Sequence, residues 1–344
     1  MHGLSAICDI RSIIESARSF VAQTVNSSLV MLYWQIGKRI KQDVLRNKRA
    51  GYGERIVATL SRQLTGDYGH SFSEKNLRRM IQFFEVFSDE KIVVSLIRQL
   101  TWTHFIALIP LEDPLQRDFY AEMCRLERWN VRTLRKKIDG MLYERTALSK
   151  KPKQLVHQEL SLLRNEDKLT PDIVFRDPYF LDFLGLKDTY SEKDIEAAIL
   201  REMEAFILEL GVGFTFLARQ KRITIDHKDY YLDLLFYHRK LHRLIAIELK
   251  LGQFQAQDKG QMELYLKWLA KHEQDADEQS PIGLILCAGK STEHIELLEL
   301  EKSGIRVAEY LTKLLPRKVL EQKLHKAIQI ARKQLEDSRI EDKS

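Results

Sequence analysis

The first half of the chain carries apolar side chains at helical spacing. They recur every three to four residues from Ile13 to Val21 and again from Val30 to Ile40, which is the period of an amphipathic helix. Glycines at 51 and 53 interrupt this pattern. Further helices are predicted at residues 54–64, 74–87, 90–100, 103–108, 114–128 and 131–144. We therefore predict a helical domain over residues 1–148.

The helical period is lost in residues 149–185. Prolines stand at positions 152, 171 and 178 among polar residues, and proline breaks regular elements. A short helix remains compatible with residues 154–163, and the aromatic stretch 172–183 is expected to form a strap onto the next domain. We predict that this segment is a linker and strap.

Helix and strand patterns alternate after residue 186. Ser191 and Asp194 have the spacing of a capping box, which opens a helix that glycines 211 and 213 end. Short apolar and β-branched runs then predict strands. The expected strands are 214–225, 229–237, 243–250, 282–287 and 305–309, with helices at 256–271, 292–300 and 317–343. This order predicts an α+β domain over residues 186–344.

The strands at 229–237 and 243–250 are expected to form a β-hairpin. If Lys240 and Leu241 are its tip, Asp233 lies directly opposite Glu248. Opposed side chains have Cβ atoms about 4.5–5.5 Å apart, and two carboxylates that close repel unless a proton or a cation lies between them. Lys250 falls on the same face as Glu248 by the two-residue period of a strand.

A solvated hairpin face is the alternative interpretation of these charges, because cross-strand ion pairs are common stabilisers. Glu248 argues against it, since this residue interrupts the apolar run from Leu244 to Leu249. A buried strand seldom carries a carboxylate without a partner. The pattern therefore favours a site for a divalent cation.

The same residues carry a resemblance to a known family. Asp233 and the run Glu248-Leu249-Lys250 resemble the PD-(D/E)XK nuclease superfamily, although Leu232 stands where the proline of that name is expected. The longer pattern is similar to the YhcG-type nuclease family, and it covers most of the chain. It comprises Tyr33-Trp-Gln-Ile-Gly37, Gly51-Tyr-Gly53, Asn76-Leu-Arg-Arg-Met80, Leu100-Thr-Trp-Thr-His104, Phe206–Phe214, Arg219-Gln220, Tyr231–His238, Ile247–Lys250 and Gly260–Tyr265.

The resemblance implies a fold and an activity. It implies a two-domain α+β protein in which a helical N-terminal domain precedes a restriction-endonuclease-like αβββαβ core. Asp233 and Glu248 would hold Mg²⁺ or Mn²⁺, with the Leu249 carbonyl as a further ligand, and Lys250 would orient or help to deprotonate the attacking water. Hard cations of this kind prefer oxygen ligands.

Further site residues follow from the resemblance and from spacing. The resemblance places an acid at Glu196, for which Glu202 and Glu204 are rivals by position. Gln261 and Tyr265 share a helix face by their spacing, and a similar pair supports the active site in related nucleases; a tyrosine packed on the sheet is the alternative. Arg219 and Gln220 are expected to contact phosphate, and Tyr265 is expected to contact the nucleic acid.

Positive charge is concentrated in the N-terminal half. The chain has a net charge of +6, yet residues 1–150 hold 24 Lys and Arg against 16 Asp and Glu, and the remainder holds 31 against 33. A basic surface attracts nucleic-acid phosphates without regard to sequence. A basic domain that binds no nucleic acid is the alternative.

The helix predicted after Ser73 could carry this binding. It presents Lys75, Arg78 and Arg79 among apolar residues and follows a short turn after another helix, an arrangement compatible with a helix-turn-helix that inserts into the major groove. A solvated basic helix face is the alternative. We expect the three tryptophans Trp34, Trp102 and Trp129 to anchor the helical core.

Composition excludes several other classes of protein. No apolar run approaches the roughly 18–20 residues needed to span a bilayer, the beginning of the sequence lacks the pattern of a signal peptide, and we expect no membrane partner. Cys8, Cys124 and Cys287 are too few and too widely spaced for a disulfide framework or a zinc site. A cytoplasmic location is expected.

The sequence thus leads to a metal-dependent nuclease that hydrolyses DNA phosphodiester bonds. The alternative is a DNA-binding or complex-forming protein without catalysis on a nuclease-like scaffold. A third possibility is a protein-interaction adaptor in a restriction or mobile-element system, for which the helical domain would be the active surface. Cutting both strands of a duplex would need two such sites, so a homodimer is compatible with the activity.

Overall fold

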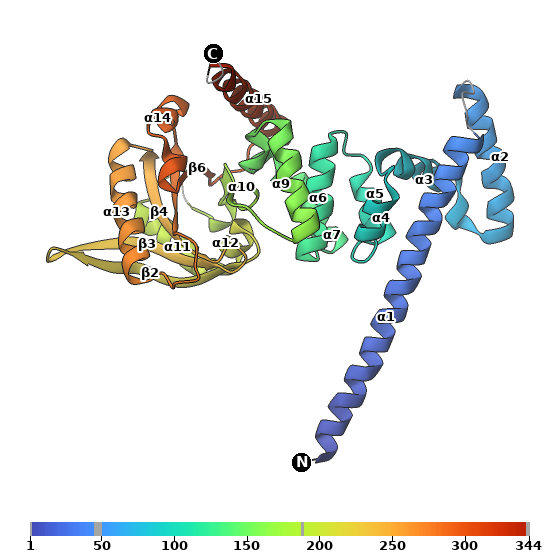
Figure 1. Cartoon of the computed structure of the whole chain (residues 1–344), viewed down its shortest axis with the longest axis horizontal. Helices are drawn as coiled ribbons and strands as arrows, with labels where there is room; N and C mark the ends of the chain where they lie inside the picture. The colour runs from blue at the N-terminus through green and yellow to red at the C-terminus, as the bar shows by residue number, and fades with distance from the viewer. Residues whose placement is uncertain (1, 45–49, 187–188, 342–344) are drawn as a thin grey trace. The chain divides into compact units, whose positions relative to one another are not determined.

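The computed structural model describes residues 2–44, 50–186 and 189–341. The chain divides into two compact units, Met1–Gly140 and Met141–Ser344. In Figure 1 the first unit runs from blue to teal and the second from green to red. Among the described residues, no helix is both long enough and apolar enough to cross a membrane.

The first unit is helical, which confirms the predicted helical fold of the N-terminal region. Glycines 51 and 53 lie inside a helix that begins at Ala50, so they do not interrupt it. The helices are α1 (His2–Arg39), α2 (Ala50–Tyr68), α3 (Glu74–Val86), α4 (Glu90–Leu96), α5 (Trp102–Leu108), α6 (Pro114–Glu127) and α7 (Val131–Asp139), with a π-helical turn at Ile40–Val44 and a 3-10 turn at His70–Phe72.

The second half of α1 packs against α3. Tyr33 and Ile40 of α1 share a core cluster with Leu77, Met80 and Ile81. The two backbones approach so closely at Gly37 that a Cβ atom there would lie 1.9 Å from the carbonyl oxygen of Met80. Glycine is therefore the residue that this helix crossing requires.

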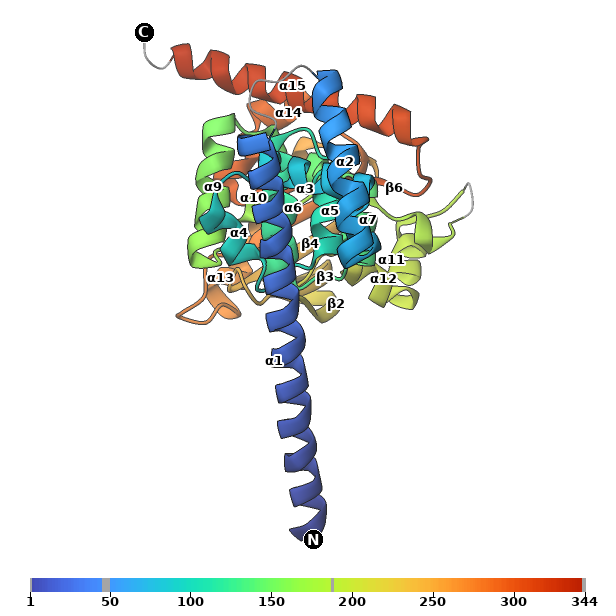
Figure 2. The same ribbon diagram turned by 90° about the vertical axis from the view of Figure 1, so that its right-hand side faces the viewer.

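Tryptophans support the helical core as expected. Trp34 is 1% exposed, and its indole N–H donates to the Phe87 carbonyl at 2.7 Å. Trp102 packs edge-on against Tyr33 and Phe83. The first half of α1, by contrast, extends away from the other helices of its unit (Figure 2).

The second unit is built on a six-stranded mixed sheet in the order β1-β6-β5-β4-β3-β2. The strands β2, β3 and β4 are antiparallel, and β4, β5, β6 and β1 are parallel. The strands are β1 (Tyr179–Phe180), β2 (Phe214–Ile225), β3 (Lys228–His238), β4 (Arg243–Gln253), β5 (Ile282–Gly289) and β6 (Ile305–Leu311).

Helices flank this sheet and complete the predicted αβββαβ order. Helices α11 and α12 precede β2, and α13 connects β4 to β5. The helix expected from residue 191 to 210 is divided at Glu202 into α11 and α12. The helices of this unit are α8 (Leu142–Arg145), α9 (Lys153–Glu166), α10 (Pro171–Val174), α11 (Glu192–Arg201), α12 (Met203–Leu210), α13 (Ala256–His272), α14 (Thr292–Leu297) and α15 (Arg317–Glu341).

The segment 149–185, expected as a linker and strap, lies within the second unit. It forms α9, α10 and β1, and β1 pairs with β6. Partly buried Asp177 holds it in place, because its carboxylate binds Lys150 at 2.7 Å and Lys290 at 2.6 Å. Its prolines stand next to the first residues of α9, α10 and β1 or at the start of these elements. They therefore mark where the short elements begin and do not make the segment an irregular linker.

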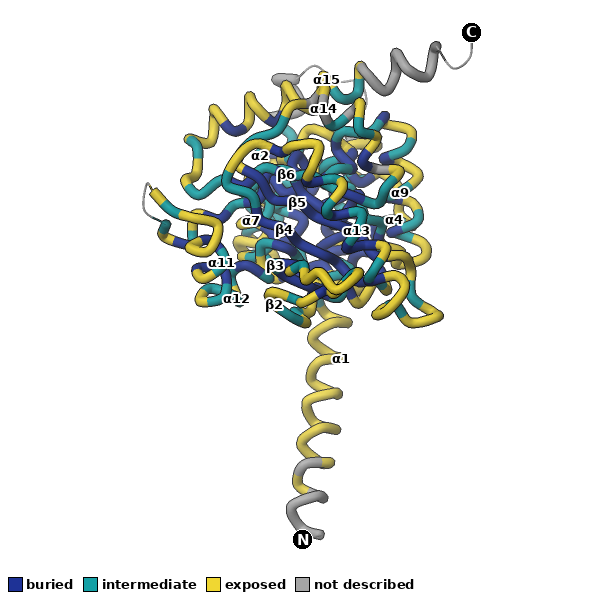
Figure 3. Tube along the Cα trace, turned by 90° about the vertical axis from the view of Figure 1, so that its left-hand side faces the viewer, coloured by how far each residue is buried: buried dark blue, intermediate teal, exposed yellow. Residues whose placement is uncertain are grey.

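The two sheet faces are covered by different helices (Figure 3). Helix α13 contributes Met262 and Leu269 to a cluster with Leu235 and Ala246. Phe236 follows Leu235 in β3 and therefore points to the opposite face, where it meets Phe206 of α12. The centre of β4 is thus buried on both sides.

Candidate active site

Asp233 and Glu248 lie opposite each other on the two strands of the predicted hairpin. The observed register pairs Leu234 with Ile247 and Leu235 with Ala246, as the predicted turn requires. Glu248 is two residues from Ala246, so it lies on the face covered by α13. Its side chain is 5% exposed, whereas that of Lys250 is 22% exposed.

Backbone hydrogen bonds hold both carboxylates in place. The N–H of Asp233 donates to Oε1 of Glu248 at 3.2 Å, and the N–H of Leu249 donates to Oδ2 of Asp233 at 2.9 Å. Each side chain therefore receives its hydrogen bond from the strand that carries the other. The arrangement fixes two acids close together within the sheet.

This closeness changes the charge state of the acids. Burial, followed by the negative charge of Asp233, raises the pKa of Glu248 to about 8. Burial likewise raises the pKa of Asp233, against the opposing effects of the Leu249 N–H and Gln220. Two such carboxylates are stabilised together by a proton or a cation.

Lys250 lies between two acids. Its Nζ is 3.5 Å from Oε2 of Glu248 and 4.0 Å from Oδ1 of Asp258. Asp258 is 7% exposed, and it also accepts the backbone N–H of Gln255 at the start of α13. Sequence reasoning missed Asp258, because a helix-capping acid gives no signal of a second role.

Gln220 connects two of the predicted acids. Its Nε2 donates to Oε2 of Glu196 and to Oδ1 of Asp233, both at 3.0 Å. Gln220 has a φ of 43° within β2, a left-handed conformation that is unusual for a residue other than glycine. The amide thus joins α11 to the carboxylate pair at a strained point of the backbone.

Glu192 is a second acid from α11 at this site that sequence reasoning missed. Its Oε1 accepts the backbone N–H of Leu251 in β4 at 3.1 Å, and its charge contributes to the raised pKa of Asp233. An acid is common in the first turn of a helix because it interacts favourably with the helix dipole, so nothing in the sequence singled Glu192 out. Glu202 and Glu204, the rivals of Glu196, fall at the break between α11 and α12.

Gln261 and Tyr265 contact each other as their spacing predicts. Gln261 Nε2 donates to the Tyr265 hydroxyl at 2.7 Å, and this hydroxyl donates to the Tyr231 carbonyl of β3 at 3.3 Å. Tyr265 is 1% exposed, so it does not offer the nucleic-acid contact that we expected of it. Burial, with the negative charges of Glu248 and Asp233, raises the pKa of Tyr265, and its contact with the Tyr231 carbonyl anchors α13 to the strand that carries Asp233.

The basic residues singled out from the sequence lie in different places. Arg219 is exposed on β2, beside Gln220. Lys75 and Arg78 are exposed on α3 of the first unit, and Arg79 is half-buried there. Arg78 pairs with Glu74 at 2.7 Å, and Arg79 contacts Asn76 at 3.4 Å. Lys75, Arg78 and Arg79 therefore belong to the first unit, whereas the carboxylates of Asp233 and Glu248 belong to the second.

The oxygen ligands that the carboxylate pair offers suit a hard cation. Asp233 and Glu248 provide oxygen atoms, and each carboxylate has lone pairs beyond the hydrogen bonds it accepts. Mg²⁺ typically takes one or two carboxylates and completes its shell with water and substrate phosphate. Within the described residues, no group of three or more His, Cys, Asp and Glu side chains gathers for a metal.

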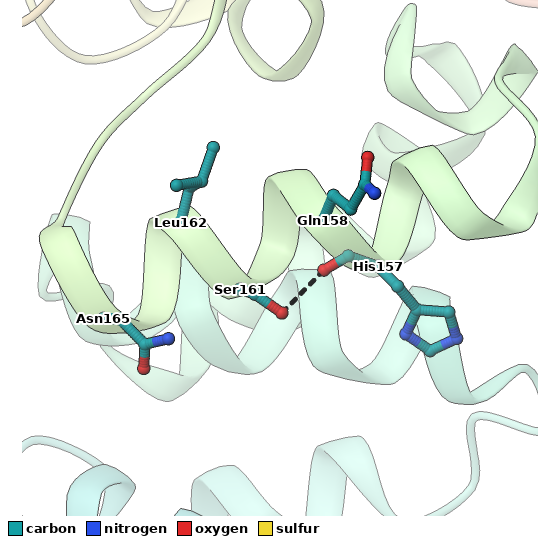
Figure 4. Close-up of a pocket in the computed structure, with 5 residues that line it drawn as sticks. All are labelled: His157, Gln158, Ser161, Leu162 and Asn165. Carbon is teal, nitrogen blue, oxygen red and sulfur yellow. Dashed lines mark hydrogen bonds between the residues drawn. The ribbon is translucent and has the colours of Figure 1, made fainter.

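A hollow on α9 does not belong to this site. All five residues that line it come from that helix, as Figure 4 shows. They are His157, Gln158, Ser161, Leu162 and Asn165. The hydroxyl of Ser161 donates to the His157 carbonyl at 2.8 Å, and we assign the hollow no chemistry.

Comparison with solved structures finds partial likeness. A crystal structure of a repair endonuclease from Pyrococcus abyssi is 20% identical and covers 38% of this chain and 50% of that chain, with a TM-score of 0.25. A structure titled as an EndoMS–dsDNA complex is 19% identical over 38% of this chain and 49% of that chain, with a TM-score of 0.28. At these scores neither likeness carries an argument about this chain.

Comparison of sequences is more informative. Residues 9–145 match the family described as DUF1016 N-terminal domain, and residues 172–325 match the YhcG PDDEXK nuclease domain. A protein of Escherichia coli (strain K12) named "Putative nuclease YhcG" is 34% identical over 308 residues, which cover 81% of each chain. With a PD-(D/E)XK-type domain preceded by the matching helical domain, this chain belongs to the YhcG nuclease family.

Proposed function

We propose that this protein is a metal-dependent nuclease that hydrolyses DNA phosphodiester bonds at the Asp233–Glu248–Lys250 site. The observation that carries the proposal is the pairing of two carboxylates across β3 and β4 with an amine beside them. The nuclease-domain match over residues 172–325 supports it.

Asp233 and Glu248 would hold Mg²⁺ or Mn²⁺. When bound, such an ion would polarise the scissile phosphate and lower the pKa of a water molecule. The raised pKa of Glu248 and of Asp233 supports this assignment, because a cation would relieve the repulsion between the two acids. The Leu249 carbonyl remains our expectation for a further ligand.

Lys250 is assigned the role of orienting the attacking water and neutralising charge that develops on the phosphate. Its partly exposed Nζ, between Glu248 and Asp258, supports this role. We assign Gln220 and Glu196 to positioning Asp233, since one amide hydrogen-bonds to both. Gln261 and Tyr265 would support β3, because Gln261 binds the Tyr265 hydroxyl and this hydroxyl donates to the Tyr231 carbonyl.

The helical unit would recruit DNA through Lys75, Arg78 and Arg79, and Arg219 would contact phosphate near the site. A homodimer would place two sites on one duplex, and proteins of a restriction or mobile-element system remain candidate partners. Cys124 and Cys287 are free and buried, which agrees with a reducing compartment, and we propose the cytoplasm.

Cleavage assays test this proposal. Purified protein is incubated with supercoiled, linear and branched DNA, and with RNA, in Mg²⁺, Mn²⁺ or EDTA. Asp233→Ala and Lys250→Ala are compared with Glu204→Ala, which changes an exposed acid on α12. We expect metal-dependent DNA cleavage that the first two variants lose by at least about 100-fold and the third retains.

Two outcomes would overturn the nuclease assignment. DNA binding without cleavage, unchanged in the three variants, would establish the non-catalytic scaffold. Cleavage that persists in Asp233→Ala and Lys250→Ala would place the chemistry elsewhere or identify a contaminant.

A further inference from the structure

The corner between α6 and α7 carries a dense run of positive charge. From Arg128 to Ile138 the chain has five basic residues and no acidic residue. Four of the five are exposed, and we call them the α6–α7 patch: Arg128, Arg132, Arg135 and Lys136. Arg128 directly follows the last residue of α6, and the other three lie on α7. The two helices contact each other in the first unit (Figure 1), so the patch belongs to one compact unit.

The three cations of α7 share one face of that helix. Successive residues of an α-helix are about 100° apart, so Arg132, Arg135 and Lys136 fall within an arc of about 100°. Leu134 lies on the opposite side and is 0% exposed. Burial of this apolar side therefore leaves the basic side in solvent. Asp139, the last residue of α7, is the one acidic residue of the helix.

The four cations of the patch are not neutralised within the part of the chain that the structure describes. None of them forms an ion pair or a side-chain hydrogen bond there. The basic residues of α3 differ, because Arg78 pairs with Glu74 at 2.7 Å and Arg79 contacts Asn76 at 3.4 Å. The positive charge of the α6–α7 patch is therefore available to a ligand.

The patch is held against the local preferences of the chain. Arg128 has a φ of 53°, a left-handed conformation that favours glycine or asparagine after a helix. Arg132 lies in the first turn of α7, where the helix dipole favours an acid. It also stands three and four residues before Arg135 and Lys136, and like charges at these spacings repel. Such departures from local rules are expected at functional sites, and a polyanion would relieve the repulsion.

The charge density of the patch suits a nucleic acid. Cβ atoms three or four residues apart on a helix are about 5–6 Å from each other, and duplex DNA carries one charge per about 1.7 Å of its axis. Several phosphates therefore fall within reach of the patch at once. Residues 128–139, all of which the structure describes, expose no large apolar side chain. A protein partner would usually need an apolar centre to its interface.

We propose that the α6–α7 patch binds the phosphate backbone of duplex DNA, without regard to its sequence. The identity of the polyanion rests on the proposed function of this chain as a DNA nuclease. The patch gives the helical unit a DNA contact on α7 that is distinct from the basic residues of α3.

The salt dependence of DNA binding tests the proposal. Binding of the full chain to duplexes of unrelated sequence is measured in EDTA at several NaCl concentrations. Each phosphate contact contributes about 0.9 to the slope of log K against log [NaCl]. Arg132→Ala/Arg135→Ala should therefore reduce the slope by about 2 and the affinity at low salt by at least about 10-fold. The matched control Lys91→Ala/Arg98→Ala removes two exposed cations elsewhere in the same unit and should leave the slope unchanged.

A second variant separates DNA binding from folding. Arg132→Glu places an acid in the first turn of α7, where the helix dipole favours it, and four residues before Lys136, where it forms a favourable pair. Chemical denaturation should therefore show that this variant is at least as stable as the parent protein. Its DNA affinity should nevertheless fall further than that of Arg132→Ala.

Three results would overturn the proposal. They are a slope unchanged in Arg132→Ala/Arg135→Ala, an equal loss of slope in Lys91→Ala/Arg98→Ala, and tighter binding of duplex RNA than of duplex DNA. Because EDTA prevents metal-dependent cleavage, binding is measured apart from the nuclease chemistry. A parent protein that binds DNA through the patch and never cuts it would overturn the nuclease assignment alone. A parent that cuts DNA while the slope stays unchanged in Arg132→Ala/Arg135→Ala would overturn the role of the patch alone.

Discussion

The backbone N–H of Asp233 donates a hydrogen bond to the carboxylate of Glu248 at 3.2 Å across β3 and β4. The site is therefore built into the sheet ladder itself, because one catalytic candidate is held by the main chain of the other. A substitution that keeps the shape of Glu248 should separate its charge from its structural role.

Glu248→Gln is such a change. We expect DNA cleavage to fall by at least about 100-fold, while the free energy of unfolding in EDTA at pH 8 rises by about 1 kcal/mol. The gain follows because burial and Asp233 disfavour the charge of Glu248. Paired cleavage and chemical-denaturation measurements check this, with Glu204→Gln as the control. If Glu248→Gln cleaves DNA at the rate of the parent protein, Glu248 has no role in catalysis.

Gln220 allows a test of backbone strain. Both Gln220→Ala and Gln220→Gly lose the amide that joins Glu196 to Asp233, and we expect cleavage to fall by about 10-fold in each. The φ of 43° favours glycine, so the glycine variant should be more stable than the alanine variant by about 1 kcal/mol. Denaturant titrations compare the two, and equal stability would argue against strain at this position.

Gly37→Ala should disrupt the crossing of α1 and α3. Its new Cβ would lie 1.9 Å from the Met80 carbonyl oxygen, and we expect a loss of at least about 1–3 kcal/mol in unfolding free energy. Gly66→Ala, in α2, is the matched control because nothing lies within 4 Å of its added Cβ, and it should stabilise by about 0.5–1 kcal/mol. Thermal melts followed by circular dichroism measure both, and two equal shifts would contradict the close approach.

His238 should make the stability of the second unit depend on pH. The side chain is 0% exposed, and burial lowers its pKa to about 4, against about 6.5 in the unfolded chain. Between these two pH values the imidazole is protonated in the unfolded state and neutral in the folded state. The free energy of unfolding should therefore fall as the pH drops from about 6.5 to 4. The full loss would be about 3 kcal/mol.

Denaturation at several pH values checks this dependence. His238→Gln should flatten the slope, even though it also loses the acceptor for the Leu241 N–H. His325→Gln, at an exposed position of α15, should leave the slope unchanged. An unchanged slope in His238→Gln would assign the effect to other groups.

The hairpin was predictable because its determinants are local. A polar turn and two apolar strands set the pairing of Asp233 with Glu248, and the strand period placed Lys250 on their face. The helix period likewise predicted that Gln261 and Tyr265 would meet. The burial of Tyr265 was foreseen only as an alternative, since it depends on how α13 packs against the sheet.

Other features depend on contacts between residues far apart in the sequence. Strand β1 is two residues long, and its partner Tyr310 lies 131 positions after Tyr179, so its sequence alone could not identify it as part of the sheet. Glu192 reaches the Leu251 N–H only because α11 packs on β4. Gly51 and Gly53 cost a helix about 1 kcal/mol each, and α2 tolerates that cost within its 19 residues.

The pairing of β1 with β6 determines where the chain can be shortened. A fragment that begins at residue 186 would lack β1, the strand that pairs with the outer edge of β6. It would also lack Asp177, which accepts the backbone N–H of Glu309 at 3.0 Å. Bare strand edges invite aggregation. A fragment that starts at Met141 would keep that edge covered, so it is the shorter version of this protein that we expect to remain in solution after expression.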